Sequence, residues 1–357
     1  MKNDLVKIFQ IATVFIGTIV GAGLASGKEI TEFFTMYGVN SFLGIIACGI
    51  FYIIMGSIIS KISIDHNLSS YSDVINIISP NILGKFTGFV TTFFLISSAS
   101  IILAGSGALI HQFFGIPKIL GSLIMISIAV FFLRRDTEGL IEVNSFIVPG
   151  LIGTLTLITA LYFSFCKDTI SFSNISSFPP QKSGLAISVI LYAGYNTLSA
   201  SGVLVPLSTQ MKKTKTMIIG VIVGAVGLTI LCLMINVLLT VNQPYIYKYE
   251  IPLLFVANRF GNIIQSLLLV IIWLEMFSTE VSDIYSISKT LEQSFNIKFK
   301  KAIFIVLGIA LLISQFGFGN LITKLYPMFG LLSLIFIVQC IIFFFKHKKD
   351  FSNTSKK

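Results

Sequence analysis

Residues 21–27 read Gly-Ala-Gly-Leu-Ala-Ser-Gly and interrupt an apolar stretch, 8–27, that is long enough to cross a membrane. A second string, Gly-Tyr-Asn-Thr-Leu-Ser-Ala-Ser-Gly, occupies 194–202 in a later apolar stretch. Both strings end in Ala-Ser-Gly, at positions 175 residues apart. Because glycine permits backbone conformations that end a helix, this pattern predicts two interrupted membrane helices, one near the start of each half of the chain.

The composition supports a membrane protein. Hydrophobic residues make up 55% of the 357 residues, charged residues make up 11%, and the mean hydropathy is +0.92. Soluble domains carry about 25% charged residues, so the composition excludes an ordinary soluble fold. Charge-free windows predict about ten transmembrane helices: 8–27, 33–60, 86–110, 119–133, 143–166, 183–211, 216–247, 260–274, 302–323 and 325–345.

The net charge of +10 follows membrane topology. With the N-terminus placed inside, 18 of the 25 lysine and arginine residues fall in inner loops or inner termini, as the positive-inside rule requires. An even number of spans then places the C-terminus inside as well. The sequence therefore predicts a multi-pass protein of the plasma membrane with cytoplasmic termini and no nucleic-acid partner.

The predicted spans divide into five and five, at about residue 180. Because five is odd, the two halves cross the membrane in opposite directions. Inverted repeats that each begin with a broken helix are typical of secondary transporters. We predict an all-α 5+5 inverted-repeat fold, with one repeat over 1–180 (break at 20–27), the other over 181–346 (break at 193–199), and a cytoplasmic tail over 347–357.

The first break has the chemistry of a binding site. Unwound backbone within a membrane is tolerated where protein covers it or where it faces a polar ligand. The half-helix after Gly23 directs its amides at the break and favours an anion, whereas the carbonyls of the half-helix that ends near Val20 suit a cation. The alternative is that Gly17-x-x-x-Gly21 and Gly23-x-x-x-Gly27 only let helices pack closely. Because a second break is predicted in span six, we favour the binding-site interpretation over close packing alone.

Span six carries polar groups at a matching depth. Tyr192, Tyr195 and Asn196 lie in the middle of an apolar helix. Polar side chains at this depth usually face a cavity or a neighbouring helix. We therefore expect them to line the site, although ordinary hydrogen bonds between helices are the alternative.

Span eight combines hydroxyl and carboxyl groups. Ser278 and Thr279 are adjacent, and their oxygens suit a hard cation such as Na⁺; the alternative is that they bond back to carbonyls one turn earlier. Acidic residues are costly inside a membrane, so the sequence also marks Glu280 and Asp283 as gating or coupling candidates. Glu29, just beyond the first break, is a further candidate. Lys28 and Glu32 are spaced for an i,i+4 ion pair.

The string from Gly17 to Gly23, Gly-Thr-Ile-Val-Gly-Ala-Gly, resembles the first-helix signature of the amino acid–polyamine–organocation superfamily, whose members have the LeuT-type fold. The longer string over 15–30 resembles the bacterial YkvI-type membrane proteins. The resemblance implies that a substrate contacts Gly21, Ala22, Gly23, Tyr192, Gly194, Tyr195 and Asn196. It also implies a Na⁺ site formed by the carbonyls of Gly17, Val20 and Glu275 with the hydroxyls of Ser278 and Thr279.

Two departures from the superfamily bear on coupling. Leu24 stands where some members place an asparagine ligand for a second Na⁺, and the fifth span has no mid-helix lysine of the kind that replaces Na⁺ in some proton-coupled members. Coupling to one Na⁺ is therefore the prediction, with H⁺ coupling as the alternative.

The sequence thus predicts Na⁺-coupled symport of an amino acid or similar small carboxylate by alternating access. The alternatives are an H⁺-coupled transporter or exchanger of amines or amino acids, and a non-transporting membrane sensor with the same fold. An enzyme is not expected, because neither His-Glu-x-x-His nor Gly-x-Ser-x-Gly occurs. The predicted partners are a small-molecule substrate and the lipid bilayer, with Na⁺ as coupling ion and no other cofactor.

Overall fold

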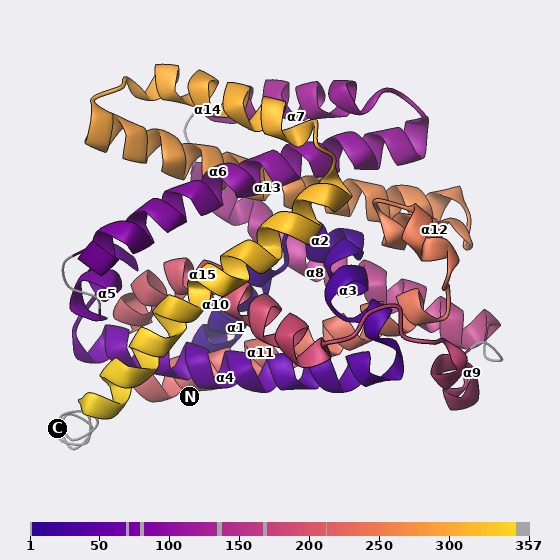
Figure 1. The fold of residues 1–357 in the computed structure, drawn as a ribbon, viewed down its shortest axis with the longest axis horizontal. Helices are drawn as coiled ribbons and strands as arrows, with labels where there is room; N and C mark the ends of the chain where they lie inside the picture. Colours follow the sequence, from indigo (N-terminus) through magenta and orange to yellow (C-terminus); the bar gives the residue numbers. More distant parts are fainter. Residues whose placement is uncertain are drawn as a thin grey trace.

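The computed structural model describes residues 2–68, 71–78, 82–133, 138–166, 170–211 and 213–347. Within these ranges every regular element is a helix, as predicted. Figure 1 shows long helices packed side by side, with the short helices α2 and α3 among them. Of the predicted tail, only His347 lies within the described ranges.

The helices follow the apolar windows of the sequence. The first half contains α1 (Lys2–Ile19), α2 (Ala22–Ser26), α3 (Lys28–Phe33), η1 (Thr35–Asn40), α4 (Ser41–Asp65), α5 (Tyr71–Ile78), α6 (Ile82–Phe114), α7 (Lys118–Leu133), α8 (Glu138–Phe165) and α9 (Phe172–Ser177). The second half contains α10 (Leu185–Met211), α11 (Thr214–Thr240), η3 (Tyr245–Lys248), α12 (Pro252–Asn258), α13 (Asn262–Phe295), α14 (Phe299–Ser314) and α15 (Phe318–Lys346).

Not all of these helices have the length and composition of a membrane span. Seven in the described ranges do: Thr35–Asp65, Phe93–Phe114, Ile147–Phe165, Leu185–Met211, Thr214–Thr240, Asn262–Glu292 and Phe318–Lys346. Helices α1, α7 and α14 occupy the other three predicted spans and have 18, 16 and 16 residues. The count of ten spans therefore stays a prediction.

The outer surface of the bundle is apolar, which identifies the side that faces lipid. On α11 the side chains of Val223, Val226 and Ile230 are between 46% and 54% exposed. A soluble protein would not present such a continuous apolar face to water. In a bilayer the same face meets hydrocarbon, while the helix satisfies its own backbone hydrogen bonds.

Small residues allow a close contact between α1 and α11. Helix α1 packs extensively against α11. A Cβ added at Gly220 would lie 2.6 Å from Ile11, and one added at Gly224 would lie 3.1 Å from the carbonyl of Ala12. The Gly-x-x-x-Gly spacing on α11 therefore lets the two backbones approach. This contact involves Ile11 and Ala12 in the middle of α1, and the interruption follows the C-terminal end of the same helix.

The two predicted breaks have different outcomes. Helix α1 ends at Ile19 and α2 begins at Ala22, so the chain leaves the helix within the predicted range of 20–27. The predicted break at 193–199 is wrong, because α10 runs without interruption from Leu185 to Met211. The hydroxyl of Thr197 donates to the carbonyl of Ala193 at 2.7 Å, so this polar group is satisfied inside a regular helix.

Candidate functional site

The interruption after α1 is built by two glycines. Gly21 is extended, with φ −107° and ψ −169°, and separates α1 from the five-residue helix α2. Gly27 has φ +81°, in the left-handed region that disfavours other residues, and ends α2 by donating its amide to Leu24 at 2.9 Å. Helix α3 then starts at Lys28, so two short helices, α2 and α3, follow the interruption.

A cavity of about 650 Å³ lies beside the interruption. Its walls come from α1, α2, α3, α6, α8, α10, α13 and α15. It collects ten of the residues predicted from sequence: Gly17, Gly21, Ala22, Glu29, Tyr195, Asn196, Glu275, Ser278, Thr279 and Asp283. The predicted substrate, ion and coupling residues are therefore brought into one space, although their roles stay predictions.

Five other predicted residues do not line the cavity: Val20, Gly23, Tyr192, Gly194 and Glu280. Gly194 faces α15, since a Cβ there would lie 2.5 Å from the hydroxyl of Ser333. Glu280 is fully buried, and neither of its carboxyl oxygens has a hydrogen-bond partner among the described residues.

Glu29 closes one end of the cavity. Its side chain is 1% exposed and accepts a hydrogen bond of 3.0 Å from the hydroxyl of Tyr192 on α10. The hydroxyl of Tyr326 and the amide of Leu24 also face the carboxyl group as donors. A Cβ added at Gly23 would collide with this carboxyl group. Gly23 therefore makes room for Glu29 within the first turn of α2.

An aromatic wall adjoins Glu29. The rings of Tyr195 and Tyr326 stack with centroids 4.2 Å apart, and Phe94 lies 5.6 Å from Tyr195. All three residues line the cavity. The sequence reasoning missed Phe94 and Tyr326, because an aromatic residue in an apolar span has no distinguishing signal. The only cue for Tyr326 is a polar aromatic beside a proline, Pro327, within the last helix.

Asn196 is held in place by neighbours on two helices. Its amide donates to the hydroxyl of Tyr52 on α4 at 3.1 Å and to the carbonyl of Tyr192 one turn earlier at 3.2 Å. The side chain is 1% exposed, although the residue borders the cavity. These bonds leave the amide oxygen as the group that Asn196 can offer to a ligand.

The predicted ion ligands lie on facing elements. Gly17 of α1 and Ser278 and Thr279 of α13 border the same cavity. The hydroxyl of Thr279 donates to the carbonyl of Glu275 at 3.1 Å, which is the bond expected for a threonine without a ligand. Both helices therefore offer oxygen ligands to a cation in the same space.

Two more carboxyl groups border the cavity from α13. Glu275 and Asp283 are 3% and 8% exposed, and the hydroxyl of Ser98 on α6 donates to Asp283. One oxygen of each group, Oε2 of Glu275 and Oδ2 of Asp283, has no hydrogen-bond partner among the described residues. Buried polar atoms are almost always partnered in folded proteins, so these two oxygens mark positions where a partner is expected.

Among the described residues, the two ends of the cavity differ in exposure. At one end Glu29 is buried, at 1% exposed. Val14, which borders the other end, is 37% exposed. Tyr192 covers Glu29, and the rings of Phe33 and Phe34 each lie 5.1 Å from the Tyr192 ring. The cavity therefore reaches the surface towards the N-terminal end of α1.

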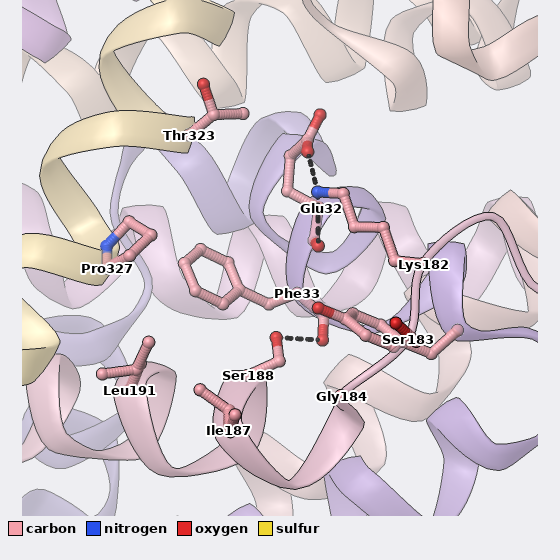
Figure 2. A pocket seen from close by; sticks show the side chains of 11 residues that line it. Glu32, Phe33, Lys182, Ser183, Gly184, Ile187, Ser188, Leu191, Thr323 and Pro327 are labelled. Atoms are coloured by element: carbon pink, nitrogen blue, oxygen red, sulfur yellow. Dashed lines mark hydrogen bonds and ion pairs between the residues drawn. The ribbon is translucent and has the colours of Figure 1, made fainter.

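A second, smaller pocket of about 190 Å³ lies beyond this seal. Figure 2 shows Lys182 reaching over Phe33 to Glu32, with Ser188 donating to the carbonyl of Phe33 at 2.8 Å. Lys182 lies 2.8 Å from Glu32, and Lys28 lies 3.1 Å from it, so the predicted Lys28–Glu32 pair is confirmed and extended. One carboxylate thus ties α3 to the segment that leads into α10.

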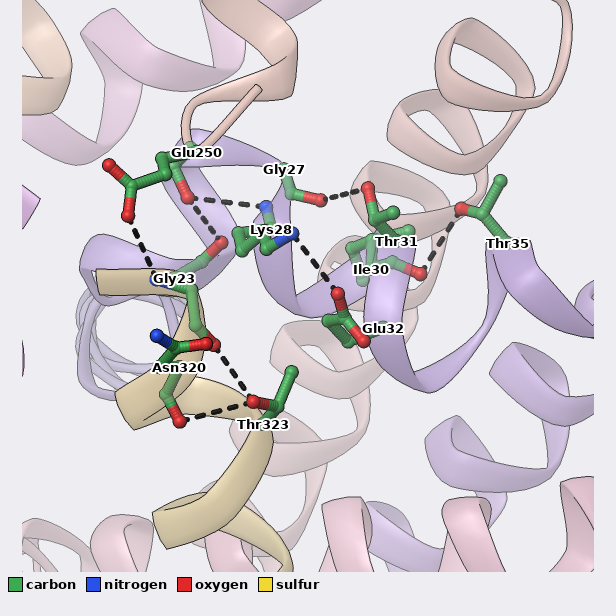
Figure 3. Close-up of polar contacts among 12 residues, drawn as sticks. Gly23, Gly27, Lys28, Ile30, Thr31, Glu32, Thr35, Glu250, Asn320 and Thr323 are labelled. Carbon is green, nitrogen blue, oxygen red and sulfur yellow. Dashed lines mark hydrogen bonds and ion pairs between the residues drawn. The ribbon is translucent and has the colours of Figure 1, made fainter. Parts of the chain in front are cut away.

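Helix α15 contributes to the same closure. Figure 3 shows the Lys28 side chain between α3 and the first turn of α15. A Cβ at Gly319 would lie 3.1 Å from Cε of Lys28, so the glycine lets the lysine pass. Glu250 forms an ion pair with Lys118 and lies 3.5 Å from the amide of Gly319. Lys28 of α3 and Glu250, in the segment before α12, therefore both contact the first turn of α15 at Gly319.

These features define an all-helical membrane protein of the LeuT type, with a central cavity beside an interrupted first helix. No family model matches the chain. It is 31% identical over 337 residues to the uncharacterised membrane protein YkvI of Bacillus subtilis, covering 94% of this chain and 96% of that protein. The chain belongs to the family of YkvI.

Solved structures share the fold at low identity. A manganese transporter of Eremococcus coleocola has a TM-score of 0.68 at 14% identity, covering 95% of this chain and 79% of that chain. MhsT, solved in complex with L-phenylalanine, has a TM-score of 0.65 at 16% identity, covering 92% and 87%. At these identities the likeness concerns the fold alone.

Proposed function

We propose that the protein is a secondary transporter that moves a small solute by alternating access. The observation that carries this proposal is the cavity of about 650 Å³, which is sealed at Glu29 and reaches the surface at its other end. A space of this size accommodates a small metabolite. The likeness of fold to a manganese transporter and to MhsT supports the same class.

The proposed orientation places the N-terminus in the cytoplasm of a cell whose plasma membrane holds the protein. Lysine and arginine are concentrated in the loops on that side. The cavity then opens inward, and the ion pairs of Glu32 form the outer closure. Outward opening requires these pairs to separate while α1 and α13 approach each other.

Na⁺ is the proposed coupling ion. Its ligands are the carbonyls of Gly17, Val20 and Glu275 with the hydroxyls of Ser278 and Thr279. Because α1 and α13 border the cavity from different sides, an ion that binds both would favour closure of the inner opening. Carboxyl groups within the same cavity keep H⁺ coupling as the alternative.

The proposed solute carries an amino group, so that it is an amino acid or an amine. The cavity offers carboxylate oxygens from Glu29 and Asp283 together with hydroxyl and amide groups, all of which can accept from an ammonium group. A sensor with the same cavity would bind such a solute without moving it.

The proposal that Na⁺ closes the inner opening is tested by cysteine accessibility. Ser282 is exposed and borders the cavity, so a Ser282→Cys variant reports on the inner opening. The half-buried Cys166 is replaced by serine, and the other three cysteines are buried. In the purified protein in detergent, where both sides are accessible, we expect a maleimide to label Cys at 282 several-fold more slowly in Na⁺ than in K⁺. Ser173→Cys on the exposed α9 is the control and should react equally in both.

Transport itself is tested in proteoliposomes. Radiolabelled amino acids and amines are supplied with an inward Na⁺ gradient and, separately, with an inward H⁺ gradient. Accumulation that requires the Na⁺ gradient supports the proposal. Binding without accumulation under either gradient would contradict transport and favour the sensor.

A further inference from the structure

The charged groups of the central cavity are all acidic. Glu29, Glu275 and Asp283 border it, and among the described residues that do so there is no lysine, arginine or histidine. Water-poor surroundings strengthen the interaction between a ligand charge and such groups. A bound cation can therefore pair with these carboxyl groups, whereas a bound carboxylate meets no basic side chain among the described lining residues.

Two of these groups each have one oxygen without a partner among the described residues. Oε2 of Glu275 and Oδ2 of Asp283 are buried and have no hydrogen-bond partner among the described residues. Their residues are 3% and 8% exposed, so bulk water does not replace the missing partner. Both face the cavity, which is where a ligand that donates hydrogen bonds would bind.

Glu29 takes the position that an amino acid's carboxylate would need. Its carboxyl group lies against Gly23 and faces the amide of Leu24 in the first turn of α2. Tyr192 and Tyr326 supply further donors to it. The donors around the interruption are therefore already used by a carboxylate of the chain itself.

The wall next to Glu29 suits an ammonium group. Tyr195, Tyr326 and Phe94 present aromatic rings to the cavity. Aromatic faces attract cations, most strongly where water is excluded. The same rings accommodate the apolar body of an organic molecule.

We propose that the transported solute is an organic amine without a carboxylate, and that Glu29 supplies from the protein the carboxylate that an amino acid would bring with it. The inference rests on the proposed transport function and narrows its substrate class. The ammonium group binds between Glu29 and the aromatic wall, and Asp283 attracts the cation along the route to the open end.

Matched pairs of ligands test this directly. The full-length protein in detergent is titrated with tyramine against L-tyrosine and with agmatine against L-arginine, each in Na⁺ and in K⁺. The members of a pair differ only by the carboxylate. Thermal shift and calorimetric titration should show binding of at least one amine, about tenfold or more tighter than its parent amino acid.

Variants then test whether Glu29 is responsible for the preference for amines over amino acids. Glu29→Gln keeps a polar side chain of the same size and should weaken amine binding about tenfold or more, since it removes the charge that the ammonium group meets. Asp283→Asn is the second variant, should Glu29→Gln not fold, and should weaken binding in the same direction. Glu292→Gln removes a carboxylate from the same helix as Asp283 at an exposed ion pair outside the cavity, and should leave affinity unchanged.

The outcomes separate the two proposals. Equal or tighter binding of an amino acid than of its amine, or binding of neither member of either pair, overturns the amine inference. Amine binding without uptake in proteoliposomes supports the inference and contradicts the transport function. Amino acid uptake with no amine uptake leaves the transporter proposal standing and overturns this one.

Discussion

The hydroxyl of Tyr192 lies 3.0 Å from Oε2 of Glu29, so one hydrogen bond joins α10 to α3 across the closed end of the cavity. Both residues are almost fully buried, at 2% and 1% exposed. The bond therefore connects an element of the first half of the chain with the first helix of the second half, at the point where the cavity would have to open outward.

Removing the Tyr192 hydroxyl should loosen this closure. Tyr192→Phe keeps the ring contacts with Phe33 and Phe34 but removes one donor from a buried carboxyl group. We expect a loss of about 1–3 kcal/mol of stability, seen as a lower Tm in detergent. Tyr285→Phe, on the exposed face of α13, is the control and should leave Tm unchanged. Equal Tm values for both variants would contradict a role for this bond in closure.

The ion pairs of Glu32 should control outer access. Its side chain is 9% exposed, and Glu32→Gln leaves Lys28 and Lys182 without their partner. Breaking a buried pair costs about 3–5 kcal/mol in favourable cases, so the variant should favour outward opening. The measurement is maleimide labelling from outside of Cys in a Ser188→Cys background, because Ser188 borders the outer pocket and is 6% exposed.

The control for the Glu32 experiment is Glu250→Gln. The Lys118–Glu250 pair is more exposed, with side chains 48% and 28% exposed, and exposed pairs contribute about 0–1 kcal/mol. Labelling at position 188 should rise several-fold in Glu32→Gln and stay near wild type in Glu250→Gln. A similar rise in both variants would mean that the closure does not depend on Glu32 in particular.

The repeated tripeptide shows where sequence reasoning succeeds and where it fails. In Ala25-Ser26-Gly27 the serine hydroxyl donates to the carbonyl of Gly23 and accepts from the amide of Lys28, so it joins α2 to α3. In Ala200-Ser201-Gly202 the hydroxyl donates to Leu198 within an uninterrupted helix. The first tripeptide follows Gly21, whose extended backbone separates α1 from α2, and its own Gly27 ends α2 at φ +81°, whereas Gly202 lies inside α10.

This contrast gives a matched pair of variants. Gly27→Ala forces alanine into φ +81° and places its Cβ 2.8 Å from Leu253, so we expect a loss of more than about 1–2 kcal/mol. Gly202→Ala lies inside α10 with nothing within 4 Å of the added carbon, and should gain up to about 1 kcal/mol from helix propensity. Tm in detergent distinguishes them, and a loss at Gly202 equal to that at Gly27 would favour an interrupted α10.

Composition and glycine spacing predict the helical fold and the interruption after α1, and polar residues within the spans, together with the family resemblance, predict ten of the residues that meet in the cavity. They do not predict the position of Glu29, because its contact with Gly23 depends on how α2 and α3 fold back. They also do not predict Tyr326, since it reaches the cavity only through the packing of α15 on α6 and α10. Tertiary packing decides both, and a single sequence carries no signal for it.

The ion site gives the last prediction. If Na⁺ closes the inner opening by binding α1 and α13 together, removal of the hydroxyls of α13 should abolish the effect of Na⁺ and leave the fold intact. Ser278→Ala with Thr279→Val keeps side-chain volume close to that of the wild type and removes two oxygen ligands. Labelling of Cys at 282 should then proceed at the same rate in Na⁺ and K⁺. Thr290→Val removes the hydroxyl that bonds back to Ser286 on the same helix, beyond the cavity, and should preserve the Na⁺ effect. Protection by Na⁺ that persists in the double variant would place the ion elsewhere, because the Glu275 carbonyl is then the one proposed ligand left on α13.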